Sequence, residues 1–117
     1  MSPLGFHHVA VFAHDVEAAA AFYRDVLSLP EQARYAHDDG SLRSVWVGIP
    51  GGGFVAIEHG EPKRGVVVLR IARSERAAWL QRFERAGVSV EKQSRWTLYV
   101  RDPAGNAVGL SHHPEDP

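Results

Sequence analysis

The chain has 117 residues, of which 44% are hydrophobic and 23% are charged, a composition typical of one globular domain and not of a disordered segment. Its formal net charge of −1 excludes the strongly basic surface that binding to nucleic acid or to an anionic membrane requires. The chain has no cysteine, so disulfides, thiolate metal ligands and thiol nucleophiles are excluded as well.

The sequence also lacks the signals of export and of membrane insertion. No apolar run approaches the roughly 18 residues that a bilayer crossing needs. The first residues, MSPLGF, lack the charged and apolar regions of a signal peptide. We therefore expect a cytoplasmic protein with neither a membrane nor a nucleic acid as its partner.

The first half of the chain predicts a strand, a helix and a hairpin. Residues 6–13 favour a strand, and Asp15 is a suitable N-cap for the amphipathic helix that follows. Residues 35–42 are polar and contain a turn signal, so no strand is predicted there. Strands are predicted at 44–49 and 54–59, joined by a glycine-rich loop.

The second half predicts the same order of elements. Residues 66–72 favour a strand, Ser74 is a candidate cap for a second helix, and Gly87 stands where a helix ends. A short strand is predicted at 88–90. The remaining predicted strands are 96–101 and 107–111.

An internal repeat supports this division. When residues 8–23 are set against 66–81, four of the sixteen aligned positions are identical. The shared order of strand, cap, helix and hairpin carries more weight than those identities. We expect a single α+β domain over residues 1–117, built from half-repeats at about 5–60 and 65–113.

Two motifs carry a family resemblance. Residues 8–15 and 22–27 read HVAVFAHD and FYRDVL, and residues 99–106 read YVRDPAGN. Together with the repeat between them, they resemble the opening and closing motifs of the vicinal oxygen chelate superfamily, the glyoxalase, bleomycin-resistance and ring-cleaving dioxygenase proteins. The resemblance implies two βαβββ modules that form an eight-stranded open cleft, completed in a homodimer.

Metal-using members of that superfamily hold a divalent ion at four positions. The resemblance places His8 and Glu58 at two of them, but Val66 and Gly109 at the other two. Neither a hydrocarbon side chain nor a glycine donates an electron pair to a cation. Since a useful site needs at least three protein ligands, we expect a degenerate metal site and no cofactor.

Histidines near the lost positions leave one alternative open. His7 and His59 each adjoin a matching residue, so strand alternation points them to the opposite face. His112 and His113 lie just beyond Gly109, and the sequence leaves open whether one of them restores a divalent metal site.

The candidate ligand-binding residues all lie on predicted strands. Glu58 follows apolar same-face neighbours and therefore needs a partner, for which His8 and Arg70 are the candidates. Arg70 can clamp an anionic group, and aromatic side chains offer stacking surfaces to a planar molecule. The full set of candidates is His8, Phe12, Trp46, Phe54, Glu58, Arg70, Trp96 and Tyr99.

These residues support competing functions. The first is a metal-free binding protein that holds a small hydrophobic or aromatic molecule, as the bleomycin-resistance branch does. The alternative is a metal-dependent glyoxalase-like lyase or isomerase, or a dioxygenase, in which His8 and Glu58 are the candidate catalytic residues. A third is a structural or regulatory dimer whose cleft is filled by its own side chains.

Overall fold

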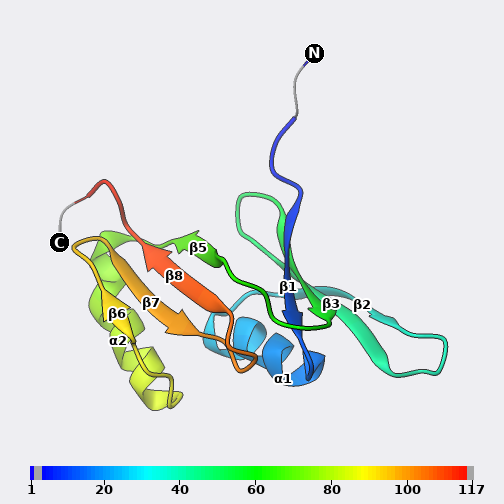
Figure 1. Cartoon of the computed structure of the whole chain (residues 1–117). Helices are drawn as coiled ribbons and strands as arrows, with labels where there is room; N and C mark the ends of the chain where they lie inside the picture. The colour runs from blue at the N-terminus through cyan, green and yellow to red at the C-terminus, as the bar shows by residue number, and fades with distance from the viewer. Residues whose placement is uncertain (2–3, 116–117) are drawn as a thin grey trace. The chain divides into compact units, whose positions relative to one another are not determined.

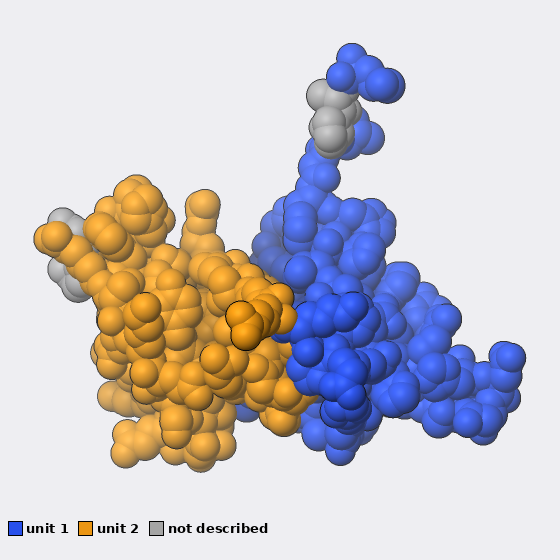
Figure 2. Space-filling view, in the orientation of Figure 1, with its two compact units in different colours: residues 1–63 blue, residues 64–117 orange. Residues whose placement is uncertain are grey.

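A computed structural model describes Met1 and residues 4–115, and its elements form two compact units, residues 1–63 and 64–117. The units are drawn as cartoons in Figure 1 and coloured separately in Figure 2. Their boundary falls within the segment around residues 61–65 that separates the two half-repeats. Each unit holds one four-stranded sheet and one main helix, which is the α+β arrangement expected from the sequence.

Unit 1 builds its sheet in the order β1-β4-β3-β2. The outer strand β1 pairs in parallel with β4, and the other pairs are antiparallel. Between the first two strands the chain forms α1 (Val16–Ala21) and the π-helical turn η1 (Phe22–Val26). The four strands are β1 (His8–Ala13), β2 (Glu31–Ala36), β3 (Leu42–Gly48) and β4 (Phe54–His59).

Unit 2 repeats this topology. Its sheet has the order β5-β8-β7-β6, in which β5 pairs in parallel with β8. A short 3-10 turn, η2 (Arg73–Glu75), leads into α2 (Arg76–Arg85). The strands are β5 (Val66–Arg70), β6 (Lys92–Gln93), β7 (Thr97–Arg101) and β8 (Ala107–Ser111). The repeated order of strand pairing confirms the two modules that the sequence predicts.

Helix α1 covers one face of the unit 1 sheet. Arg34 of β2 lies directly opposite Val45 of β3, so their side chains share a face, and the Arg34 guanidinium reaches Glu17 of α1 at 3.2 Å. The buried valines and isoleucine of the sheet belong to this same face. They pack with the buried α1 residues Ala19 and Ala20 to form the core of unit 1.

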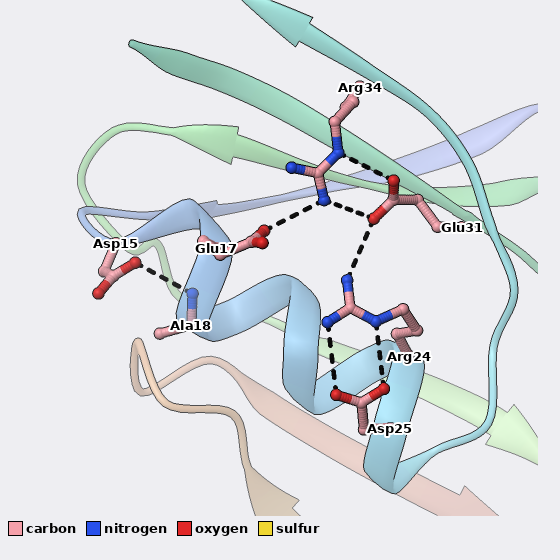
Figure 3. A network of polar contacts seen from close by, with 7 residues as sticks. All are labelled: Asp15, Glu17, Ala18, Arg24, Asp25, Glu31 and Arg34. Atoms are coloured by element: carbon pink, nitrogen blue, oxygen red, sulfur yellow. Dashed lines mark hydrogen bonds and ion pairs between the residues drawn. The ribbon is translucent and has the colours of Figure 1, made fainter.

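A polar network holds the helical segment against β2 (Figure 3). Glu31 accepts hydrogen bonds from Arg34 Nη2 at 2.7 Å and from Arg24 Nη1 at 3.1 Å, and Arg24 also pairs with Asp25. The hydrogen bonds from Arg34 hold the pKa of the Glu31 carboxyl below its usual value. At the start of the helix Asp15 accepts from Ala18 N at 3.0 Å, which confirms its role as the N-cap.

Three sequence predictions about elements are wrong. Strand β2 occupies residues 31–36, where no strand was predicted. The strand predicted at 88–90 is absent, and β6 forms at 92–93 instead, because Val88 N donates to Phe83 O and so still belongs to the end of α2. Ser74 does not cap α2, since it lies inside η2 and no side-chain cap bond forms there.

Unit 2 packs its core in the same way. Arg76 of α2 donates to Gln93 Oε1 of β6 at 3.1 Å, and Gln93 lies opposite Leu98 of β7, so α2 covers the Leu98 face. Phe83 of α2 is fully buried in this core. Among the described residues, no helix has the length and hydrophobicity needed to cross a membrane.

Candidate functional site

The face of the unit 1 sheet that lies away from α1, which we call the far face, carries a row of rings. His8 stacks on Phe54 with ring centroids 4.9 Å apart, and Phe54 stacks on Trp46 at 4.4 Å. Trp46 meets Tyr35 edge to face at 4.9 Å. This aromatic row (His8, Phe54, Trp46 and Tyr35) therefore crosses β1, β4, β3 and β2 in turn.

The register explains why the row forms. His8 lies opposite Phe54, and Trp46 lies opposite Ala56, one same-face step further along β4. The small side chain of Ala56 leaves room for the Trp46 ring to lean onto Phe54. Stacked and edge-to-face ring pairs of this kind stabilise a sheet beyond their buried area.

Glu58 lies on the far face beside the aromatic row. It is half-buried between Phe12 of β1 and Ser44 of β3, its direct cross-strand neighbours. Within the described part of unit 1, no residue forms a hydrogen bond or an ion pair with its carboxylate. A carboxylate among apolar side chains costs free energy unless it is paired, so Glu58 is suited to meet a donor from outside the unit.

Two more polar atoms on this face lack partners. Ser44 Oγ and the indole nitrogen Nε1 of Trp46 are buried, and neither has a hydrogen-bond partner among the described residues. A buried polar group left without a partner costs about 1–3 kcal/mol. A molecule that displaces the side chains covering these atoms, and offers an acceptor to Trp46 or a donor to Ser44, would recover part of that cost.

Several sequence predictions on unit 1 need correction. His8 and Glu58 are not neighbours, because Phe54 is the residue opposite His8 and Glu58 lies four residues further along β4, about 13 Å at the usual strand rise. His8 is therefore not the partner of Glu58. Its nearest polar contact is His7, whose Nδ1 lies 2.8 Å from its own. The His7 ring also touches Phe54, so it is on the far face, not on the opposite one.

The remaining predicted residue of unit 1, Phe12, lies at the edge of the aromatic row. Its ring is half-buried. The ammonium nitrogen of Lys63 lies 4.6 Å from the ring centroid, a cation–π contact. The ring also closes over Gly60, where an added Cβ would come within 3.1 Å of Phe12 Cδ1. Phe12 therefore belongs to the wall beside Glu58, its direct neighbour on β4.

In unit 2 the predicted residues are divided between a sheet face and a loop. Tyr99 lies directly opposite Gly109, and Val68 flanks Gly109 on the other side. Trp96 comes just before β7, where its ring meets His113 edge to face at 5.0 Å. Its Nε1 is buried without a hydrogen-bond partner among the described residues. Arg70 ends β5 opposite Ser111.

The residues at the family's metal positions do not fit a metal ion. Only His8 and Glu58 carry donor atoms, and the register separates them along the sheet. Among the described residues, no group of three or more His, Asp or Glu side chains is placed to hold an ion. At Gly109 an added Cβ would stand 3.2 Å from Thr97 Cγ2 and 3.3 Å from Tyr99 Cε1, so neighbouring side chains occupy the space from which a ligand at this position would extend.

His112 does not restore the site. It is buried, and both of its ring nitrogens have partners: Nε2 lies 3.0 Å from Arg76 Nη1, and Nδ1 lies 2.7 Å from the carbonyl oxygen of Glu115. Since the guanidinium only donates, Nε2 accepts and the proton is on Nδ1. His113 is exposed and packs against Trp96.

A hollow at the N-terminal end of α1 was not anticipated from the sequence. It has a volume of about 320 Å³ and is lined by His14, His37 and His59 among others. His37 and His59 meet edge to face at 5.5 Å, and His14 pairs with Glu61 at 3.2 Å. His59 shares the face of Ile57 and not that of Glu58, as strand alternation predicts.

Comparison with known proteins agrees with the fold. The family model described as Glyoxalase/Bleomycin resistance protein/Dioxygenase superfamily matches residues 5–110. No curated protein matches the chain.

Solved structures add three similar folds. A lactoylglutathione lyase from Agrobacterium tumefaciens is 27% identical, with a TM-score of 0.79, 97% of this chain covered and 96% of that one. A mutant of the fosfomycin resistance protein FosX from Listeria monocytogenes, complexed with Mn(II), is 16% identical with a TM-score of 0.78, and the match covers 94% of this chain and 93% of that one. The oxidase ChaP-H2 is 20% identical with a TM-score of 0.78, and the match covers 97% of this chain and 96% of that one. The last two likenesses concern the fold alone.

Proposed function

Because this chain belongs to the glyoxalase/bleomycin resistance protein/dioxygenase superfamily, we propose that it binds a small hydrophobic or aromatic molecule without a metal ion. The binding surface is the far face of unit 1. The observation that carries this proposal is the aromatic row with the unpartnered Glu58 carboxylate beside it. Stacking surface and one polar anchor are the elements from which small-molecule sites are built.

The chemistry of the face restricts the ligand. A planar ring gains both buried apolar area, worth about 25 cal/mol per Å², and stacking with Phe54 and Trp46. Glu58 has no partner within unit 1, so it favours a ligand that carries an N–H or O–H donor. Residues 1–63 hold eight Asp and Glu against four Lys and Arg, and this acidic balance favours a donor that is positively charged over one that is neutral.

Tryptophan fluorescence tests the proposal directly. The chain has three tryptophans, so the double variant Trp79→Phe and Trp96→Phe leaves Trp46 as the only reporter. We expect saturable quenching by planar aromatic amines, with affinity reduced about two- to tenfold by Phe54→Leu, the equivalent of a ring contact worth 0.5–1.5 kcal/mol.

The control for that experiment is an apolar side chain outside the row. Leu4 is fully exposed and precedes β1, so Leu4→Ala should leave the affinity unchanged within twofold. Quenching that fails to saturate for every compound in a broad panel, or that is equally weakened by Leu4→Ala, removes the main support for binding at the aromatic row.

One observation favours a second candidate function. The likeness to lactoylglutathione lyase reaches 27% identity over nearly the whole of both chains, which favours a metal-dependent lyase or isomerase that uses His8 and Glu58. Against it stand the separation of these two residues along the sheet and the missing donors at Val66 and Gly109. We therefore rank it second.

We also propose that the protein is a cytoplasmic homodimer. The superfamily resemblance supports the dimer, and the absence of cysteine suits a reducing compartment. Light scattering coupled to gel filtration should give twice the chain mass of 12.9 kDa.

A further inference from the structure

Unit 2 contains a hollow whose lining differs in chemistry from the aromatic row. It has a volume of about 240 Å³ and is lined by Val68, Leu69, Arg70, Ser111 and His113. None of these residues is acidic. Three of them carry polar side chains, and two of those, Arg70 and Ser111, lie directly opposite each other at the ends of β5 and β8.

Two side chains in this hollow have hydrogen-bond donors without an acceptor among the described residues of unit 2. Ser111 Oγ accepts from Thr97 Oγ1 at 2.8 Å and from His113 N at 3.2 Å. Since both of those groups donate to it, the hydroxyl proton of Ser111 is directed elsewhere. The guanidinium of Arg70 forms no hydrogen bond or ion pair with any described residue of unit 2, although it has five N–H donors.

Charge and apolar area beside the hollow point to the kind of ligand. Residues 64–117 hold nine Lys and Arg against six Asp and Glu, so the unit attracts anions. Val66 and Val68 share the Arg70 face of β5 and are each 50% exposed. An unpaired cation at one end of a half-exposed apolar strip is complementary to a molecule with an anionic head and an apolar body.

We propose that unit 2 binds the carboxylate of a small organic acid in this hollow. The Arg70 guanidinium pairs with the carboxylate through two parallel N–H bonds, the fork geometry that favours arginine at such sites. The Ser111 hydroxyl donates a third bond, and the apolar part of the acid lies along Val68 and Val66. This site is on the other sheet from the aromatic row and does not depend on it.

Titration by NMR tests the site with defined probes. Benzoate is added to the ¹⁵N-labelled full chain, and its neutral analogue benzamide and inorganic phosphate are added in separate series. We expect benzoate to shift the amide signals of Val68, Ser111 and His113 saturably. Benzamide lacks the charge and phosphate lacks the apolar body, so each should bind at least tenfold more weakly.

Two variants that each remove one positive charge distinguish a specific binding site from general electrostatic attraction. Arg70→Gln should weaken benzoate binding at least tenfold. Arg85→Gln removes the same charge from the exposed end of α2 and should change the affinity by less than twofold. Equal effects of the two variants, or equal binding of benzoate and benzamide, overturn the proposal. Phosphate binding as tight as benzoate binding overturns the assignment to an organic acid. None of these results bears on quenching at Trp46, so the two proposals fail independently.

Discussion

The Glu58 carboxylate has a place in the fold that stability alone does not explain. It is flanked by Phe12 and Ser44 on a largely apolar face and has no partner within the described part of unit 1. Residues of this kind are often retained for function at the expense of stability. A ligand with a donor group would give this carboxylate the partner that unit 1 does not supply.

Replacement of Glu58 by an apolar residue should therefore separate stability from binding. We expect Glu58→Leu to raise the free energy of unfolding by about 0.5–1.5 kcal/mol while it abolishes the preference for ligands with a donor group. Urea denaturation measures the first effect and Trp46 quenching the second.

The matched control is Glu84→Leu, which removes the same charge from an exposed position on α2. It should shift stability by no more than about 0.5 kcal/mol and leave binding unchanged. A urea midpoint for Glu58→Leu below that of the parent chain would show that Glu58 stabilises the fold, contrary to this account.

At the scale of single residues, the sequence predicted the sheet face on which a side chain lies better than it predicted which residues lie next to each other. Strand alternation correctly placed Glu58 on the face of Phe54 and placed His59 on the opposite face, since successive side chains point in opposite directions, but it placed His7 on the wrong face. It could not reveal that His8 and Glu58 lie far apart, because the pairing of β1 with β4 is set by the long connection between them. Tyr35 was missed as part of the row because the strand that carries it was not predicted.

Among the elements, the turn before β8 depends on one buried carboxylate. Asp102 Oδ1 accepts from Ala104 N at 2.9 Å and from Asn106 N at 2.8 Å, and its Oδ2 accepts from Asn106 Nδ2 at 2.9 Å. Asp102 and Asn106 are both buried. This part of the closing motif therefore fixes the β7–β8 connection, a structural role.

Removal of that carboxylate should destabilise the fold without touching either proposed site. We expect Asp102→Ala to lower the free energy of unfolding by about 2–4 kcal/mol, because three bonds to a charged acceptor are lost and buried donors are left unpaired. Asp102→Asn keeps one acceptor oxygen but turns an amide towards Asn106, so its loss should be intermediate. Urea denaturation of the three chains gives the order, and a loss for Asp102→Ala below about 0.5 kcal/mol would show that the turn forms without these bonds.

The missed strand and the misplaced strand have separate physical causes. The β2 sequence EQARYA lacks the apolar alternation that marks a half-buried strand, because charged residues face α1 through the network of Glu31 and Arg34. The valine at position 88 favours a strand by propensity, yet its backbone N–H caps the end of α2. Tertiary pairing and helix capping override local preference at both places.

For the whole molecule, the repeat predicted more than any single motif did. The order of strand pairing, first with fourth and then third and second, is the same in residues 1–63 and 64–117. The sequence aligned these halves through only four identities in sixteen positions, since β-branched and alanine residues satisfy the same packing in many combinations. The chemistry of the halves has diverged further than their topology, with an acidic first unit that carries rings and a basic second unit that carries Arg70.

The residues at the four metal positions, which come from both halves, lead to a prediction about metal ions for the intact protein. A metal ion bound at 100 times its dissociation constant stabilises a fold by about 2.7 kcal/mol, which corresponds to roughly 10 °C in Tm for a chain of this size. Because His8 and Glu58 are separated along the sheet and Val66 and Gly109 offer no donors, we expect 100 µM Zn²⁺, Ni²⁺ or Mn²⁺ to raise Tm by less than about 2 °C.

We likewise expect EDTA to leave Tm unchanged in protein purified without a nickel resin. Exposed histidines such as His14 and His59 can bind ions weakly, so the comparison includes the variant His8→Ala. A rise of many degrees that disappears in His8→Ala would restore the metal-dependent enzyme as the leading function, whereas a rise that persists in the variant locates the ion elsewhere and leaves the aromatic row metal-free.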